Sequence, residues 1–462
     1  MIMAMIRPET EMKDSGVQWI GDIPSDWETT PLKKIVVDRA GGAWGNEPYE
    51  NNSTICMRIA DFDFDRGVFQ DKSETELTKR SYKEYQIDKL LLQTNDICIE
   101  KSGGGEKTPV GRAVLFDKPY DALFANFMDR IRVDNAVSFP KYVEYYLRAM
   151  YFLSVTILYI KQTTGIQNLN VTSLLEKEVI TLPPLSEQQV IADYLDETCS
   201  KIDEIIAEAK ASIDKYKELK QSVIFEAVTK GFDKNVEMKA VNLEYLDSCP
   251  LDWNILPVSI LFDFFGGFAY KSDRFCEETN NQVVRLGNVK DDELRLNSNP
   301  VYVSDEYADD SSKAAIKVDD ILFTMTGTRG KGDYFYTLII TEDDLKEKNL
   351  FLNQRVGCFR KAYHTVYMPY YNYLLKSPKI REWVFLYETG TANQGNIGIE
   401  NINRIRLYNP PMEVQKNIVR MLNQKCNTID SLITEKESLI NDLEAYKKSL
   451  IYEVVTGKRR VV

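Results

Sequence analysis

Histidine and paired cysteines are almost absent from this sequence, and their scarcity limits the chemistry that it could perform. Its 462 residues include one histidine, His364, and seven cysteines with no Cys-x-x-Cys pair. Zinc-hydrolase spacings, Ser-His-Asp triads and Cys-His dyads need more histidines or better-placed ones. No GxxxxGK[ST] motif is present, so no phosphate-cradling nucleotide loop is indicated. We therefore expect no metal site and no catalytic residue, and reduced thiols typical of a cytoplasmic protein.

Long apolar runs are also missing. The most apolar stretch, Ala149 to Ile160, is too short to span a bilayer, and we interpret it as a buried helix. The start of the chain, Met1 to Thr10, lacks the basic and then apolar pattern of a signal peptide, so no membrane association is expected. The net charge of −12 argues against a protein that coats nucleic acid indiscriminately, although a basic face would still permit DNA binding.

What the sequence does contain is an internal repeat. Pro183-Pro184 and Pro410-Pro411 each close a stretch of short apolar runs and open a long helical one, and the step from Pro183 to Pro410 defines the repeat offset. The same offset relates further pairs: Cys199 and Cys426, Ile202 and Ile429, Glu226 and Glu453, Thr229 and Thr456. A duplicated globule and helix predicts a molecule with approximate two-fold internal symmetry.

The repeat divides the chain into segments of two kinds. We predict an N-terminal extension at 1–14, globular blocks at 15–182 and 242–409, and helical spacers at 183–241 and 410–462. Each block has a strand-like run, at 96–99 or 320–323, and a helix-like run, at 142–159 or 370–387. The predicted fold class is therefore mixed α/β (α+β), with two globules and a pseudo-two-fold internal repeat.

Each predicted helix carries an apolar stripe with alternating steps of four and three residues. A stripe kept up from Leu195 to Ala227 and from Leu422 to Val454 is typical of a coiled-coil seam. Lysines interrupt it at Lys220, Lys436 and Lys447, and we expect their stems to follow the seam with the ammonium groups exposed. The main seam positions are Leu195, Ile202, Ile206, Ile213, Val223, Leu422, Ile429, Ile433, Ile440 and Leu450.

Two copies related by a pseudo-dyad can pair these stripes only in antiparallel orientation. We therefore predict a long antiparallel two-helix coiled coil that separates the two globules. A helix from Leu195 to Ala227 is about 50 Å long at 1.5 Å per residue, which equals about 15 base pairs of DNA. The alternative is a pair of amphipathic helices that each pack only on their own globule.

One motif imitates a catalytic one. Asn409-Pro410-Pro411-Met412 resembles the Asn-Pro-Pro-aromatic loop with which amino-methyltransferases hold a flipped adenine. That loop needs an aromatic ring in its fourth position to stack on the base, and Met412 does not provide one. Because prolines suit the first turn of a helix, the motif is interpreted as a helix start. It gives no reason to expect catalysis by this chain.

Two matched glycine-containing loops are the main candidates for ligand binding. Glycines let backbone amides approach a phosphate, hydroxyls donate to it, and cations neutralise it. Arginine can also read a guanine edge in the major groove. An ordinary mobile hairpin is the alternative, but a loop of this kind in both copies favours DNA. The candidate residues are Lys101, Ser102, Gly103, Gly104, Lys107 and Arg112 in the first copy, and Thr326, Arg329 and Lys331 in the second.

Further candidates lie next to these loops in the sequence. Arg130, Arg132, Arg355 and Arg360 occupy possible neighbouring strands and are second-rank candidates for DNA contacts. Gln167 and Gln394 are related by the repeat offset, so they stand at the same place in each copy. These glutamines either contact bases or, as we favour, brace the junction between globule and helix.

Three stretches resemble the specificity subunits of type I restriction–modification systems. They are Gly16-Val-Gln-Trp-Ile-Gly-Asp-Ile-Pro-Ser-Asp-Trp27, Leu182-Pro-Pro-Leu-Ser-Glu-Gln-Gln-Val-Ile191 and Glu226-Ala-Val-Thr229. The resemblance covers essentially the whole chain in the order of that family: recognition domain, helix, recognition domain, helix. The second junction, Asn409-Pro-Pro-Met-Glu-Val-Gln415, departs from the pattern without disturbing that order.

The resemblance implies a non-catalytic subunit whose two target-recognition domains read the halves of a bipartite, asymmetric double-stranded DNA target. It also implies docking of restriction subunits and of methyltransferase subunits, of which we expect two. The chain itself is expected to bind no cofactor, because the methyl donor and ATP would belong to those partners. A protein of a different class is the alternative: a scaffold that binds proteins rather than DNA through two globules on the same coiled coil.

Overall fold

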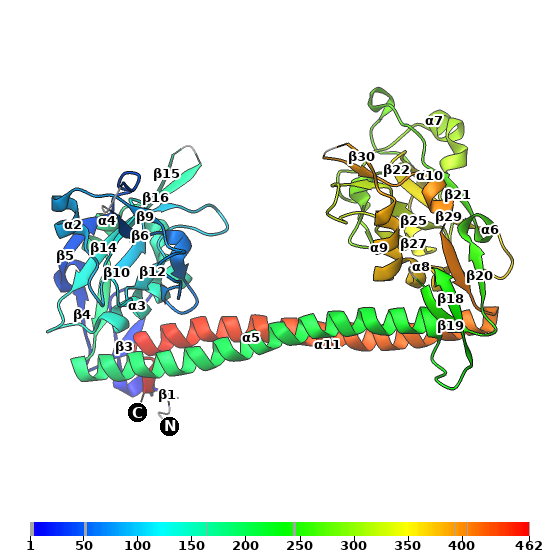
Figure 1. Cartoon of the computed structure of the whole chain (residues 1–462). Helices are drawn as coiled ribbons and strands as arrows, with labels where there is room; N and C mark the ends of the chain where they lie inside the picture. Colours follow the sequence, from blue (N-terminus) through cyan, green and yellow to red (C-terminus); the bar gives the residue numbers. More distant parts are fainter. Residues whose placement is uncertain are drawn as a thin grey trace. The chain divides into compact units, whose positions relative to one another are not determined.

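The structure, a computed structural model, describes residues 4–49, 53–163, 165–243, 246–391, 393–403 and 405–461. The chain forms two compact units: unit 1 is Met1–Ala211 with Lys436–Val462, and unit 2 is Ser212–Glu435. Each unit contains one globular domain, called domain 1 or domain 2, and part of each of two long helices (Figure 1). The boundary between the units falls inside both long helices, after Ala211 and after Glu435.

Both long helices begin directly after a proline pair, as predicted. α5 spans Leu185–Lys230 and α11 spans Met412–Val455, so both end before the predicted boundaries at 241 and 462. Gly231 and Gly457 follow the helix ends with a φ of 74° each, the left-handed conformation that commonly stops a helix. Among the described residues, no helix is long and apolar enough to cross a membrane.

The two helices run antiparallel in each unit, and reciprocal ion pairs fix their register. In unit 1 the Lys447 ammonium lies 2.6 Å from Asp203, and in unit 2 that of Lys220 lies 2.7 Å from Asp430. The repeat offset relates Lys220 to Lys447 and Asp203 to Asp430. Reciprocal contacts of this kind are typical of pairing about a two-fold axis. The predicted antiparallel orientation is confirmed within each unit.

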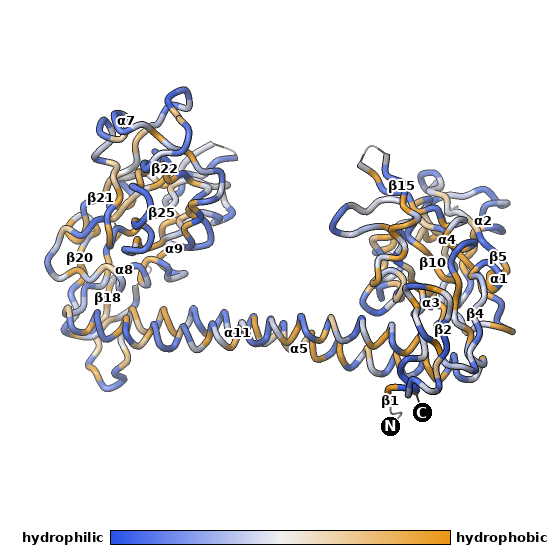
Figure 2. The backbone as a smooth tube through the Cα atoms, turned by 180° about the vertical axis from the view of Figure 1, so that it is seen from behind, coloured by the Kyte–Doolittle hydropathy of each residue, from blue (hydrophilic) through white to orange (hydrophobic). Residues whose placement is uncertain are grey.

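The predicted seam residues turn away from solvent, while polar residues alternate with them along both helices (Figure 2). In unit 1, Leu195, Ile202, Ile206 and Leu450 belong to the core of domain 1, and Ile440 packs against that core. The seam residues of unit 2 are the buried Ile213, Leu422 and Ile429 and the half-buried Val223 and Ile433. The seam residues near the ends of the long helices therefore also pack on the domains. Packing of this kind was required by the alternative interpretation, in which each amphipathic helix packs on its own globule.

Domain 1 is built on a six-stranded mixed sheet. Its order is β5-β14-β10-β12-β8-β7, and β12 and β8 form the one parallel pair in that sheet. The strands are β5 (Val36–Gly41), β14 (Met128–Val133), β10 (Ile97–Glu100), β12 (Ala113–Leu115), β8 (Val68–Phe69) and β7 (Phe62–Asp63). β10 corresponds to the strand predicted at 96–99.

Smaller sheets complete domain 1. Strands β13 (Ala122–Phe124) and β6 (Thr54–Met57) pair in parallel, and β9 (Lys79–Arg80) extends that sheet. Strand β17 (Val179–Leu182) pairs with β4 (Glu28–Pro31) and delivers the chain to α5. The shorter helices of the domain are α1 (Leu32–Ile35), α2 (Glu84–Leu90), α3 (Pro140–Phe152) and α4 (Val171–Lys177).

Domain 2 repeats the central strands of this arrangement. Its main sheet has the order β21-β29-β25-β27, which corresponds to β5-β14-β10-β12, and β22 pairs in parallel with β28 as β6 does with β13. The strands are β21 (Phe262–Gly266), β29 (Val356–Lys361), β25 (Ile321–Thr324), β27 (Thr337–Ile339), β22 (Asn281–Val284), β28 (Asn349–Leu352), and the entry and exit pair β20 (Asn254–Pro257) and β32 (Arg406–Asn409). The two domains therefore share one scaffold, as the repeat predicted.

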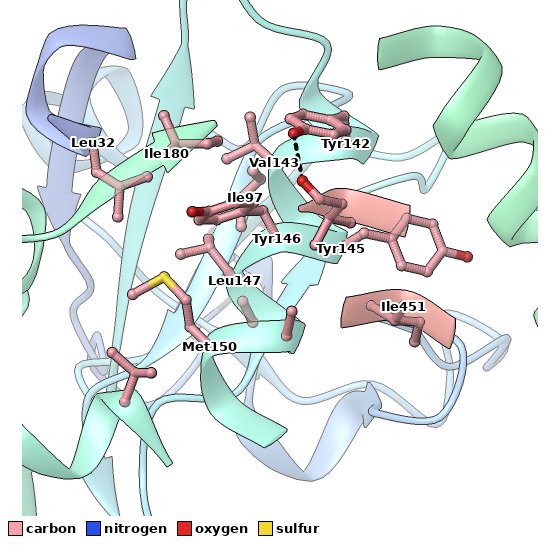
Figure 3. Packing of buried hydrophobic residues seen from close by; sticks show 14 of the residues in the cluster. Leu32, Ile97, Tyr142, Val143, Tyr145, Tyr146, Leu147, Met150, Ile180 and Ile451 are labelled. Atoms are coloured by element: carbon pink, nitrogen blue, oxygen red, sulfur yellow. Dashed lines mark hydrogen bonds between the residues drawn. The ribbon is translucent and has the colours of Figure 1, made fainter. Parts of the chain in front are cut away.

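A helix of each domain ties that domain to the end of a long helix. In domain 1, Tyr142 and Tyr146 of α3 lie four residues apart and belong to the same buried core as Ile451 of α11, next to which Tyr145 lies (Figure 3). The Tyr142 hydroxyl donates to the carbonyl of Val455, at 3.0 Å, and in domain 2 that of Tyr370 donates to the carbonyl of Val228, at 2.8 Å. Each domain thus binds the last turn of one long helix and the first turns of the other.

A buried glutamine braces each junction between domain and helix. The Gln188 side chain accepts from the amide of Phe139 at 2.8 Å and donates to the carbonyls of Val137 and Pro183 at 3.1 and 2.9 Å. Gln415 makes the same three kinds of bond in unit 2, and both residues have no exposed surface. Because a buried amide left unbonded is costly, these glutamines set the angle at which each helix leaves its domain.

Several predicted elements differ from the structure. The apolar run at Ala149–Ile160 is not one buried helix, because α3 ends at Phe152 and a 3-10 turn at Val155–Tyr159 follows. Leu158 in that turn is 78% exposed. The helix predicted at 370–387 is two helices, α8 (Met368–Leu375) and α9 (Pro378–Leu386), because Pro378 cannot continue a helix.

The described part of the predicted N-terminal extension is packed on unit 1. β1 (Ala4–Ile6) pairs with β33 (Arg459–Val461), the strand that follows α11, and β2 (Met12–Asp14) pairs with β3 (Asp22–Pro24). In unit 2 the strand that follows α5, β18 (Met238–Leu243), pairs with β19 (Leu246–Pro250). This hairpin, in which Met238 lies opposite Pro250, corresponds to β2–β3, in which Met12 lies opposite Pro24.

Candidate DNA-recognition surfaces

The candidate loop of domain 1 leaves the main sheet at the end of β10. Lys101 follows that strand, and β11 (Ser102–Gly103) then pairs with β16 (Ile166–Leu169) of a hairpin whose other strand is β15 (Ile160–Thr163). Residues 104–109 form the outer part of the loop. Gly103 and Gly104 have φ values of 121° and 57°, and a Cβ on Gly104 would lie 2.8 Å from the carbonyl oxygen of Thr108. Glycine is therefore required at this turn.

The loop of domain 2 has the same topology. β25 is followed by Met325 and β26 (Thr326–Gly327), which pairs with β31 (Gly395–Asn396) of the hairpin completed by β30 (Thr389–Gly390). Glu388 orders the loop, because its carboxylate accepts from the amide of Gly330 at 3.0 Å and from the hydroxyl of Tyr334 at 2.8 Å. The sequence match between the two loops thus corresponds to a structural match.

Three predicted cations reach solvent from these loops. Lys107, Arg329 and Lys331 are all exposed. Among the described residues, the ammonium groups of Lys107 and Lys331 form neither a hydrogen bond nor an ion pair, and Arg329 donates only to the carbonyl of Gly390, at 3.3 Å. These side chains retain most of their capacity to bind an anion.

Polar groups of the second loop are held in place beside these cations. The hydrogen bonds from Thr328, one of them from its amide at 2.7 Å, hold the pKa of Asp333 below its ordinary value, so this neighbour of Lys331 stays charged. Thr326, in β26, is half-buried at the root of the loop. Near the tip, the loop therefore presents two cations and one carboxylate rather than a uniformly positive surface.

Four other predicted arginines and lysines are engaged in ion pairs within the domains. The Lys101 ammonium lies 2.7 Å from Asp129, which also binds Arg39. Arg112 forms two bonds to Glu100, at 2.8 and 3.0 Å. The remaining two are Arg130, which is 1% exposed and donates to Asp38, and Arg360, which donates twice to Asp320.

The pairing of Arg360 is a structural feature of the shared scaffold. In domain 1 its counterpart Arg132 binds both oxygens of Asp96, at 2.7 and 2.8 Å, and each pair joins adjacent strands of the main sheet. The hydrogen bonds to Asp320 raise the pKa of the Arg360 guanidinium, as those to Asp96 raise the pKa of Arg132. Because these guanidinium and ammonium groups already have acidic partners within the domains, Arg130, Arg360, Lys101 and Arg112 become weaker candidates for DNA contacts.

Arg355 differs from these residues. Its side chain is exposed on the turn between β28 and β29 and, among the described residues, forms no hydrogen bond or ion pair. The carbonyl oxygen of Arg355 accepts from the amide of Met325 at 3.1 Å, which places this turn directly against the second candidate loop. Of the second-rank arginines, Arg355 alone keeps a free guanidinium in the part of the chain that the structure describes.

Gln167 has a different role from the one that we favoured. Gln167 is buried in β16, and its side chain accepts from the amide of Val110 at 3.3 Å, so it braces the candidate loop of domain 1. Gly395, not Gln394, lies opposite Gly327 in the equivalent strand pair. The junctions are instead braced by Gln188 and Gln415. Their position shortly after Pro183 and Pro410, at the repeat offset, is the sequence signal that could have identified them.

Comparisons with known proteins connect this geometry to a family. The model of the type I restriction modification DNA specificity domain matches residues 24–215 and again 250–442. The chain belongs to this family. Two copies of the specificity domain are therefore present, and each match covers one globular domain and part of the long helix that follows it.

Two similar proteins, both named as specificity subunits of type I restriction enzymes, align with most of this chain. The specificity subunit of the type I restriction enzyme MjaVIII from Methanocaldococcus jannaschii is 25% identical over 374 residues, which are 80% of this chain and 81% of that one. The specificity subunit of the type I restriction enzyme StySPI from Salmonella potsdam is 20% identical over 442 residues, 95% of this chain and 90% of that one.

Solved structures show the same fold for the specificity chain. A chain of a type I R-M system has a TM-score of 0.69 at 13% identity and covers 94% of this chain and 99% of its own length. The HsdS subunit from Thermoanaerobacter tengcongensis has a TM-score of 0.54, also at 13% identity, with 94% and 98% covered. At such low identity these likenesses describe the arrangement of the backbone.

The motif that imitates a methyltransferase loop has a structural role in the specificity chain. Asn409 is 5% exposed, and its side-chain oxygen accepts from the Tyr371 hydroxyl at 2.8 Å and from Gln415 at 3.3 Å. Its amide is therefore hydrogen-bonded at the junction between domain 2 and α11. Among the described residues, no group of three or more His, Cys, Asp or Glu side chains could hold a metal ion.

Proposed function

We propose that this chain is the non-catalytic DNA-specificity subunit of a type I restriction–modification complex. The two matches to the DNA specificity domain support the proposal most directly. The matched glycine-containing loops, with exposed cations at the same topological place in both domains, support it independently. Phosphate contacts from such loops would give affinity, and contacts to base edges would give sequence specificity.

The proposed target is bipartite and asymmetric. The two domains share strand order, yet their loops differ: the first loop carries Lys107, whereas the second carries Arg329 and Lys331. Different loops on one scaffold would read different half-sites, while the helices span a middle segment that is not read. In this proposal the length of these helices, whose register is held within each unit by the Lys447–Asp203 or Lys220–Asp430 pair, would set the spacer.

Partners supply the chemistry in this proposal. Two methyltransferase subunits would bring the methyl donor and the active site to a flipped adenine, and restriction subunits would bind ATP and cleave. The specificity chain would bind no cofactor of its own and would place the partners on DNA. We infer that the helical spacer and the adjoining faces of the domains provide the docking surface.

Mapping of methylated adenines across the genome tests the function. Cells that carry the gene together with its methyltransferase partner are expected to methylate one asymmetric, two-part sequence, and cells without the gene are expected to lose that methylation. Unchanged methylation, together with no retention of DNA by the complex, would contradict the proposal and favour the protein-binding scaffold.

Lys331 and Lys101 provide a matched test of the loop contacts. Lys331→Ala is expected to weaken DNA binding about three- to tenfold and to reduce the slope of log affinity against log salt by about 0.9, because one phosphate contact is lost. Lys101→Ala is expected to change the slope less, because Asp129 already neutralises that ammonium. Binding titrations of the complex from 50 to 200 mM salt (about the range over which counterion release is resolved) measure both slopes. A wild-type slope for Lys331→Ala would remove this residue from the interface.

A further inference from the structure

A second loop-like element lies beside the candidate loop in both domains. It is the turn between the parallel strand and the next strand of the main sheet, at residues 125–127 in domain 1 and 353–355 in domain 2. In domain 1 the carbonyl oxygen of Phe127 accepts from the amide of Lys101 at 2.9 Å, as that of Arg355 does from Met325 at 3.1 Å in domain 2. The two turns are therefore equivalent, and each is fixed to the root of its candidate loop.

A glycine holds each turn in place from the other side. A Cβ on Gly42 would lie 2.1 Å from the carbonyl oxygen of Ala125, and one on Gly267 would lie 2.3 Å from that of Asn353. The amides of Gly42 and Gly267 bond across the turn to the carbonyls of Met128 and Val356 at 3.0 and 3.1 Å. Because neither position tolerates a side chain, both domains build the same rigid turn, which presents its outer residues in a defined place.

The outer residues of the two turns differ in chemistry. Phe127 in domain 1 is 49% exposed, whereas the equivalent residue of domain 2 is Arg355, whose exposed guanidinium has no partner among the described residues. An exposed aromatic ring offers apolar or stacking contacts to bases, and a free guanidinium offers donors to a phosphate or to the acceptors of a guanine edge. The shared scaffold thus carries an uncharged contact in one domain and a cationic contact in the other.

In domain 2 the turn also forms one wall of a cavity of about 430 Å³ that is lined mainly by residues with polar side chains. The opposite wall is a segment held by Arg285, which donates to the carbonyl of Asn299, and by Asn288, which donates to those of Arg295 and Ser298 at 2.9 Å each. These two side chains are committed to holding the wall. Asn299, Asn353 and Gln354 line the cavity beside Arg355, and among the described residues their side chains form no hydrogen bonds.

We propose that the 353–355 turn and its cavity are a second DNA-reading element of domain 2, in which Arg355 binds anionic or acceptor oxygens of DNA and the neighbouring amides bind a base edge. Amide side chains pair with the edge of adenine, and arginine pairs with phosphate or with guanine. Phe127 makes the corresponding contact in domain 1 without charge. This inference rests on the proposed function and assigns to each half-site a different balance of charged and apolar contacts.

Binding of the full complex to its own target, at several salt concentrations, tests the inference. Arg355→Ala is expected to weaken binding about tenfold, with partial recovery in Arg355→Lys, and, where the guanidinium binds a phosphate, to reduce the salt slope by about 0.9. Phe127→Ala, the matched variant, is expected to weaken binding about three- to tenfold with an unchanged slope, because no charge is removed. Each variant is expected to unfold at the same temperature as the wild type, which would show that the substitution has not disrupted the fold.

Single base-pair substitutions in the half-site of domain 2 identify the bound group. A loss on Arg355→Ala that is equal for every substituted target indicates a phosphate, and a loss that disappears when one G·C pair is replaced indicates a guanine edge; both results support the inference. If the wild-type complex binds its target and Arg355→Ala keeps the wild-type affinity and slope, the inference is overturned and the proposed function stands. If the wild-type complex does not bind DNA, the proposed function itself is overturned.

Discussion

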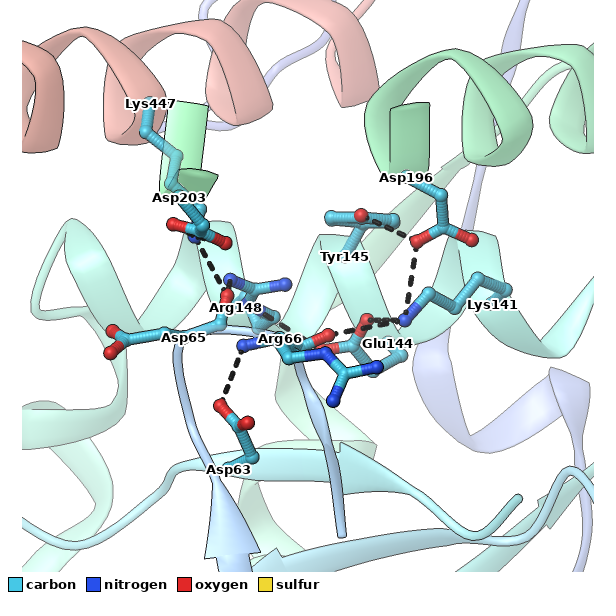
Figure 4. A network of polar contacts seen from close by, with 10 residues as sticks. All are labelled: Asp63, Asp65, Arg66, Lys141, Glu144, Tyr145, Arg148, Asp196, Asp203 and Lys447. Atoms are coloured by element: carbon cyan, nitrogen blue, oxygen red, sulfur yellow. Dashed lines mark hydrogen bonds and ion pairs between the residues drawn. The ribbon is translucent and has the colours of Figure 1, made fainter. Parts of the chain in front are cut away.

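Replacement of Lys447 by methionine is expected to lower the free energy of unfolding of unit 1 by about 2–3 kcal/mol, because it breaks a mostly buried ion pair. Lys447 is only 7% exposed, and its ammonium binds both oxygens of Asp203 and, at 2.8 Å, the carbonyl oxygen of Asp65 in domain 1 (Figure 4). We predicted an exposed ammonium here, and the structure shows that this was wrong. The lysine instead joins both long helices to the domain.

The repeat supplies the control. Lys220 occupies the same register in unit 2, but the side chains of Lys220 and Asp430 are 32% and 50% exposed. Water can replace the partners of an exposed pair, so Lys220→Met is expected to cost about 0.5 kcal/mol. Denaturant unfolding, with hydrogen exchange to locate the loss in α5 and α11, compares the two variants. Equal losses in both would show that burial does not distinguish the pairs.

A second substitution separates the ion pair from packing. In Lys447→Met the Asp203 carboxylate loses its partner, and Asp203→Leu in the same chain removes that unpaired charge. The double variant is expected to regain about half of the lost stability, although the Asp65 carbonyl keeps only its bond from Arg148, at 2.8 Å. A double variant no more stable than the single one would show that the loss came from the packing of the lysine stem.

The features that sequence predicted best depend on neighbours in the chain. The proline pairs and the four-three stripe located α5 and α11, because helix starts and amphipathic faces are set by residues a few positions apart. Strands near 97 and 321 were found for the same reason. The break at Pro378 was not predicted, although its cause is local, because the apolar residues of 370–387 were interpreted as one continuous helix.

Which side chains are free to bind a ligand could not be predicted from neighbours in the chain. Arg130 is neutralised by Asp38 and Arg360 by Asp320, which lie 92 and 40 residues away in the sequence. Such partners become neighbours only when the strands pair, so a cation next to a glycine loop is not evidence of a free charge. The equivalence of Phe127 and Arg355 was hidden as well, because it follows from strand register, whereas the repeat offset would match Phe127 with Gln354.

Removal of seven residues from each long helix is expected to shorten the spacer of the DNA target by about three base pairs. Seven residues span about 10.5 Å of helix, and a base-pair step is about 3.4 Å. Residues 208–214 of α5 and 436–442 of α11 are suitable, because they lie between the Asp203–Lys447 and Lys220–Asp430 pairs, both of which remain. A deletion of one heptad in each helix also preserves the phase of the apolar seam.

Binding of the complex to a DNA library with spacers of graded length measures the change. The preferred length should decrease and the affinity should fall, because three base pairs also rotate one half-site by about 100° around the DNA axis. Deletion from α5 alone is the control: it leaves the two helices unequal, so it is expected to reduce binding at every spacer length. An unchanged preferred length in the double deletion would show that something other than the helices sets the distance between the half-sites. Denaturant unfolding checks the fold of the variant. If the variant with both deletions unfolds at the same denaturant concentration as the wild type, the apolar seam is intact in both units and the result concerns the spacing alone.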